Sequence, residues 1–102
     1  MALEKKYLED SSLCKVTFSL SKEIAKLAKT VHLVGEFNDW DEKATPMKQL
    51  KDGSFSVTLD LERGREYQFR YLIDHKIWEN DWNADKYALT HFGDCDNSVV
   101  VV

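Results

Sequence analysis

The sequence predicts an all-β domain built as a sandwich or a barrel, and two observations support this fold class. Apolar and polar residues alternate over several short segments, which is typical of strands with one buried face. Turn-forming residues separate these segments at intervals of about eight to twelve residues. With 102 residues, 43% of them hydrophobic, the chain has the size and composition of one globular domain.

The first predicted strand is Lys15–Leu20, in which Val16 and Phe18 point to the same side as Leu20. The segment 21–29 that follows has apolar residues at helical spacing behind Ser21, a possible helix cap. It is compatible with either a single helical turn or an irregular loop.

The second predicted strand, Thr30–Val34, is apolar and β-branched, and it ends at Gly35, where the chain can bend or approach another backbone closely. Strands are also predicted for Met47–Leu50 and Ser54–Leu61. Asp52-Gly53 lies between them, and such a pair is a strong hairpin signal because glycine adopts positive φ without steric cost.

In the last third of the chain, Tyr67–Ile73 alternates again, and a hairpin around residues 74–76 returns through Ile77 and Trp78. The segment 79–93 is too irregular to assign, and Ser98–Val102 forms the last predicted strand. The residues that we expect in the core are Val16, Phe18, Leu33, Phe55, Val57, Leu59, Phe69 and Tyr71.

Charge and hydropathy exclude two classes of partner. The formal net charge of -4 argues against nucleic acid, because phosphate binding depends on clustered Lys and Arg. We expect no membrane partner, because no apolar run approaches the roughly 20 residues that span a bilayer. The start of the chain, 1–10, is charged and lacks the apolar stretch of a signal peptide. We therefore expect a cytoplasmic protein.

No metal site or cofactor is expected from the cysteines and histidines. Cys14 and Cys95 lie near opposite ends of the chain, and in the cytosol we expect them to stay reduced. His32, His75 and His91 have no recognised ligand spacing.

Tryptophans in turns are the most informative feature. Trp40 closes the polar stretch 35–40, and Trp78 and Trp82 bracket another. The C–H face of a glucose unit stacks on an indole, while its hydroxyls need directional partners such as Asn, Asp, Arg or Lys. The alternative is that these tryptophans cover the ends of the core. Phe37, in the same loop as Trp40, is expected to point inward. Trp40 and Trp78 are better candidates than Trp82.

Five blocks of the sequence, in this order, resemble carbohydrate-binding module family 48. They are Val31-His32-Leu33-Val34-Gly35-Glu36-Phe37-Asn38-Asp39-Trp40, Pro46-Met47, Asp52-Gly53-Ser54-Phe55, Tyr67-Gln68-Phe69-Arg70-Tyr71-Leu72-Ile73-Asp74 and Asn97-Ser98-Val99-Val100. The family includes the glycogen-binding domain of the AMP-activated protein kinase beta subunit and the early-set domains of isoamylases and branching enzymes. The resemblance, from residue 16 to the end, implies an immunoglobulin-like antiparallel β-sandwich of the early-set type.

By this resemblance, the glucan-binding residues are Trp40, Arg70, Trp78 and Asn97. The chain departs from the family pattern in two places: Arg70 stands where binding members tend to have Lys, and Asp74-His75 replaces the usual Asp-Gly turn. An arginine keeps the charge but reaches hydroxyls with a different geometry. Trp78 is chosen over its neighbour Ile77 because only tryptophan can stack.

The resemblance implies a binding module and not an enzyme. Glycoside hydrolysis needs two carboxylates held across a cleft, and in the resembling enzymes these belong to a separate barrel domain. We expect an N-terminal extension over 1–13 and one domain over 14–102. The expected partner is an α-1,4-linked glucan such as glycogen, starch or a maltooligosaccharide. The alternative is a protein-interaction or regulatory module that docks on a glucan-metabolising enzyme or a kinase without binding sugar.

Overall fold

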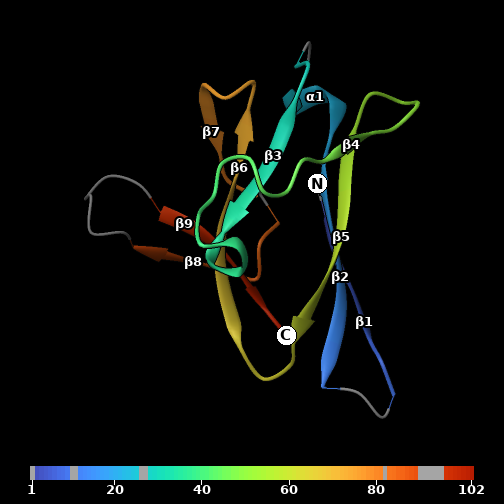
Figure 1. Cartoon of the computed structure of the whole chain (residues 1–102), viewed down its shortest axis with the longest axis vertical. Coiled ribbons are helices and arrows are strands. Elements are labelled where there is room, and N and C mark those ends of the chain that lie inside the picture. Colours follow the sequence, from blue (N-terminus) through green and yellow to red (C-terminus); the bar gives the residue numbers. More distant parts are fainter. Residues whose placement is uncertain (1, 10–11, 26–27, 82, 90–95) are drawn as a thin grey trace.

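The computed structural model describes residues 2–9, 12–25, 28–81, 83–89 and 96–102, which form two antiparallel sheets packed as layers (Figure 1). Sheet A consists of β1 (Ala2–Tyr7), β2 (Leu13–Leu20), β4 (Lys48–Gln49) and β5 (Phe55–Glu62), in the order β1-β2-β5-β4. Sheet B consists of β3 (Val31–Gly35), β6 (Glu66–Ile73), β7 (Ile77–Glu79), β8 (Lys86–Leu89) and β9 (Asp96–Val101). Its order is β3-β6-β9-β8, and β7 also pairs with β6. The predicted all-β, immunoglobulin-like sandwich is confirmed.

Two short helical segments connect these strands. Helix α1 (Lys22–Ala25) follows β2, so the segment after the first predicted strand contains a helical turn. The 3-10 helix η1 (Glu36–Asn38) follows β3. No helix in the described ranges is long and apolar enough to cross a membrane. Trp82, His91 and Cys95 lie outside those ranges.

The core fills the space between the inner faces of the two sheets. Of the eight expected core residues, six are buried, while Val57 and Leu59 on β5 are half-buried and pack against the cluster. The rings of Phe18 and Phe69 meet edge to face at 5.0 Å between centroids, joining sheet A to sheet B. Cys14 is a buried free thiol within this core.

The residues expected to form an N-terminal extension contain a strand. β1 pairs with β2 along its length, from Ala2 opposite Ser19 to Tyr7 opposite Cys14. Lys5 of β1 also reaches the residue before β8, where its Nζ lies 2.6 Å from Asp85 Oδ2. β1 therefore belongs to the sandwich and helps to hold its two layers together at one edge.

Candidate functional site

The register of sheet B decides which face each candidate residue occupies. Side chains alternate along a strand, and Phe69 and Tyr71 of β6 lie in the core. Arg70 and Leu72 therefore belong to the opposite, outer face. Trp78 of β7 pairs with Leu72, so Trp78 lies on the outer face as well.

Asn97 joins Arg70 on this outer face because β9 is the antiparallel neighbour of β6. The Arg70 Nη2 donates to the carbonyl oxygen of Asp96 at 3.1 Å. The Asn97 Nδ2 donates to Gln68 Oε1 at 2.9 Å. The sheet thus brings together three of the four residues proposed from the sequence, and it fixes two of them by hydrogen bonds.

Trp78 stands on the hairpin that joins β6 to β7, with 43% of its surface exposed. The turn is formed by Asp74 and His75, both left-handed, with φ of 52° and 56°. The Oδ1 of Asp74 accepts hydrogen bonds from the backbone N–H groups of Lys29 and Thr30, which attaches the turn to the chain before β3. These bonds keep the pKa of the Asp74 carboxyl below its usual value.

Trp40 is positioned by a loop and not by a strand. It is 38% exposed and left-handed, with φ of 58°, a conformation that costs a non-glycine residue about 1–3 kcal/mol. The Asn38 amide holds the loop: its Oδ1 accepts from Gly35 N, and its Nδ2 donates to Leu33 O and Thr45 Oγ1. The loop therefore presents an indole to solvent on a strained backbone.

The Trp40 loop begins beside β6. Gly35 pairs with Phe69, and η1 contacts both β3 and β6. A Cβ on Gly35 would lie 2.5 Å from the Gln68 carbonyl oxygen and 2.8 Å from Phe69 Cβ, so only glycine fits this close approach. The loop thus starts one residue beyond Val34, the partner of Arg70.

Beneath the candidate residues, the outer face of sheet B carries buried apolar side chains. Val34, Leu72 and Val99 are buried but do not belong to the core cluster between the sheets. Their register positions place them on the same face as Arg70. The outer face of sheet B therefore has buried apolar side chains next to the sheet, with the polar and aromatic candidate residues on the same face.

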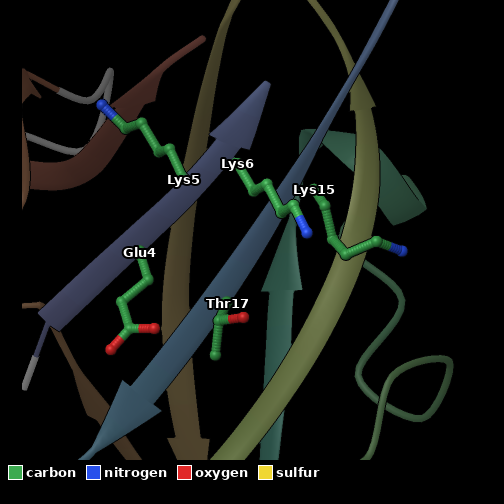
Figure 2. Close-up of a pocket in the computed structure, with 5 residues that line it drawn as sticks. All are labelled: Glu4, Lys5, Lys6, Lys15 and Thr17. Carbon is green, nitrogen blue, oxygen red and sulfur yellow. The ribbon is translucent and has the colours of Figure 1, made fainter. Parts of the chain in front are cut away.

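The outer face of sheet A differs in character. It is polar, with a hydrogen bond between the hydroxyls of Thr17 and Thr58 at 2.9 Å. A hollow of about 200 Å³ here is lined by Glu4, Lys5, Lys6, Lys15 and Thr17. Figure 2 shows Lys6 and Lys15 extending to one side of the crossing strands and Lys5 to the other. None of these five side chains offers an aromatic ring on which a sugar could stack.

A buried polar network lies next to the site, and sequence reasoning did not find it. Asp81 is fully buried, and its Oδ2 accepts from the Tyr71 hydroxyl at 2.8 Å while its backbone N–H donates to Ser98 Oγ at 2.8 Å. Burial, and then the charge of Asp81, raises the pKa of the Tyr71 phenol well above its usual value. The one sequence feature that indicates this network is the polar run between Trp78 and Trp82.

Two histidine rings contact one another at the edge of the site in a tilted arrangement. The rings of His32 and His75 lie 4.6 Å apart between centroids, and His32 sits opposite Leu72 on the outer face. Burial, with a smaller contribution from His75, lowers the pKa of His32. Within the described ranges, no group of three or more His, Cys, Asp or Glu side chains could hold a metal ion.

The chain is similar to known proteins over most of its length. The family model for carbohydrate-binding module 48, the isoamylase N-terminal domain, matches residues 6–90 and confirms the resemblance seen in the motifs. A 1,4-alpha-glucan branching enzyme GlgB from Photobacterium profundum is 44% identical over 43 residues, which are 41% of this chain and 6% of the enzyme. A protein of the same name from Novosphingobium aromaticivorans is 36% identical over 64 residues, 61% of this chain and 9% of that protein. The chain spans less than a tenth of these curated relatives.

Proposed function

We propose that this chain, which belongs to the carbohydrate-binding module 48 family, binds α-1,4-linked glucan through exposed tryptophans and does not cleave it. The glucans are glycogen, starch and their maltooligosaccharides. The observation that supports the proposal most is the exposed indole of Trp78 on the same sheet face as Arg70 and Asn97. Trp40, on a loop that begins beside this face, supplies a second indole.

Stacking should supply most of the affinity. A sugar hydroxyl exchanges water for protein, so each hydrogen bond adds only about 0.5–1.5 kcal/mol, whereas each indole also removes apolar surface from water. An open site of this kind should bind one glucan chain in the micromolar to millimolar range, or about -8 to -4 kcal/mol. Branched glycogen should bind more tightly through multivalency.

The polar residues have complementary roles in this proposal. The Asn97 Nδ2 already donates to Gln68, so Asn97 offers its Oδ1 as an acceptor. Arg70 has only donors, and its guanidinium is fixed through Asp96. A sugar hydroxyl both donates and accepts, so neighbouring hydroxyls of one glucose unit suit this pair.

The chemical groups of the proposed contacts argue for binding without cleavage. Hydrolysis needs an acid and a second carboxylate on either side of the glycosidic bond. The proposed contacts are instead two indoles, a guanidinium and an amide. The relatives named as branching enzymes are more than ten times longer than the stretch they share with this chain.

Isothermal titration with maltoheptaose tests the proposal. Trp78→Ala and Trp40→Ala should each weaken binding at least about tenfold, and Arg70→Ala should cost less. Tyr7→Ala is the matched control, because Tyr7 is an exposed aromatic on β1 of sheet A. No heat from the wild type at millimolar sugar, or equal affinity in the tryptophan variants, would favour the protein-docking alternative.

A further inference from the structure

Strand β6 changes its neighbour within the candidate site. On one edge it pairs with β3. On the other edge, Tyr71–Ile73 pair with β7, whereas Glu66–Phe69 pair with β9. Arg70 lies between these two ladders, so β7 and β9 follow one another along the same edge of β6 and meet beside Arg70.

The side chain of Asn80 closes this junction. Asn80 is the first residue after β7, and its Nδ2 donates to the Asp96 carbonyl at 2.8 Å. Its Oδ1 accepts from the Ser98 backbone N–H at 3.1 Å and from Ser98 Oγ at 2.8 Å. The Asp96 carbonyl and the Ser98 backbone N–H lie on either side of Asn97 in the chain. The side-chain amide thus bonds to β9 as the backbone of a neighbouring strand would.

On the core side of the junction, buried hydrogen-bonding groups hold the Asn80 side chain in place. Ser98 Oγ donates to Asn80 and accepts from the backbone N–H of Asp81, whose carboxylate is held by Tyr71. Asp81 and Ser98 have no exposed surface, so both are shielded from competing water. Asn80 therefore has a defined orientation.

The junction connects three of the proposed sugar contacts. Trp78 lies two residues before Asn80, and Asn97 lies between the two backbone groups that Asn80 binds. The carbonyl of Asp96 accepts from both Asn80 and Arg70. β7 has three residues, and so short a strand is weakly held by its own ladder.

We propose that Asn80 is a positioning residue, which sets the spacing between Trp78 and Asn97 and does not itself contact the sugar. The inference rests on the proposed function, because it assigns Asn80 a role in that glucan site. A glucan that stacks on Trp78 while bonding to Asn97 needs both groups at a fixed separation. Loss of the Asn80 amide lets β7 and β9 move apart.

The test is titration of the whole chain with maltoheptaose. Asn80→Ala should bind about five- to tenfold more weakly than the wild type. Asn80→Asp should bind no better than Asn80→Ala, because it places a carboxylate oxygen, which cannot donate, against the carbonyl oxygen of Asp96. The control Val16→Ala removes buried surface from sheet A, and while folded it should bind like the wild type. Wild-type affinity in Asn80→Ala would overturn the proposal.

A double-mutant cycle separates positioning from general destabilisation. In a Trp78→Ala background, Asn80→Ala should weaken binding by less than about twofold, because the residue it positions is gone. In a Trp40→Ala background its full effect should remain. Equal effects in the two backgrounds would refute the coupling to Trp78.

Spectra without sugar distinguish failure of this inference from failure of the proposed function. In ¹H–¹⁵N NMR, Asn80→Ala should shift the Trp78 indole and Asn97 side-chain signals and leave the Trp40 indole in place. Unmoved Trp78 and Asn97 signals would refute the inference even if sugar binds. A wild type that binds no sugar would refute the proposed function, and with it the role of Asn80 in a glucan site, whatever these spectra show.

Discussion

Removing the Tyr71 hydroxyl should test the buried network that supports the site. Asp81 is fully buried and accepts the Tyr71 O–H at 2.8 Å, so Tyr71→Phe leaves a buried carboxylate oxygen without this donor. Hydrogen bonds to charged groups contribute about 1.5–3 kcal/mol, and the ring itself is kept. We expect the free energy of unfolding to fall by about 2–3 kcal/mol.

Urea denaturation at 25 °C, followed by tryptophan fluorescence, measures this change. Tyr67→Phe is the matched control, since Tyr67 is a buried tyrosine on the same strand and face. Among the described residues, its hydroxyl bonds to the Glu62 carbonyl at a long 3.5 Å, so the cost should stay below about 1 kcal/mol. Equal losses in the two variants would refute the reasoning about the buried carboxylate.

Four further outcomes are expected. Phe69→Ala, at a fully buried position, should cost about 3–5 kcal/mol in urea denaturation, and a loss under about 1 kcal/mol would contradict the assigned core. Gly35→Ala places a Cβ against the backbone of β6 and should cost about 1–3 kcal/mol; an unchanged midpoint would show that the approach is looser than described. The folded-state pKa of His32 is lowered, so unfolding takes up a proton when the pH lies between that lowered pKa and about 6.5. The free energy of unfolding therefore decreases as the pH falls through this range. His32→Gln should flatten the dependence of Tm on pH between about 7 and 5, and parallel curves would exclude His32 as the cause. The purified protein should release no reducing sugar from glycogen, and release that a single carboxylate substitution abolishes would make it an enzyme.

Alternation in the sequence predicted three inner strands, β2, β5 and β6, whereas the edge strands β1 and β8 were not predicted. β2, β5 and β6 each turn one face to the core, and the residues on that face recur at every second position. β1 is an edge strand with the run Glu4-Lys5-Lys6, and charge of this kind protects edges from aggregation while hiding the pattern. β8, an edge strand of sheet B, has only four residues and lies within the segment 79–93, which was too irregular to assign.

The candidate residues came from motifs, whereas their surroundings depend on long-range pairing. Arg70 meets the Asp96 carbonyl 26 positions away, and this contact needs the register of β6 with β9. The left-handed backbone of Trp40 has no sequence signal, because such positions usually carry glycine or asparagine. The hydrogen bonds of Asn80 to Asp96 and Ser98 form only where β6 changes neighbours, which no local pattern indicates.

The most direct test of a glucan site on the outer face of sheet B is a ¹H–¹⁵N NMR titration of the wild type with maltoheptaose. We predict that the largest shifts fall on the indoles of Trp40 and Trp78, the side-chain amide of Asn97 and the backbone of Arg70. Signals from Lys6 and Lys15, on the outer face of sheet A, should stay in place. Shifts centred on sheet A, or none at millimolar sugar, would contradict the account.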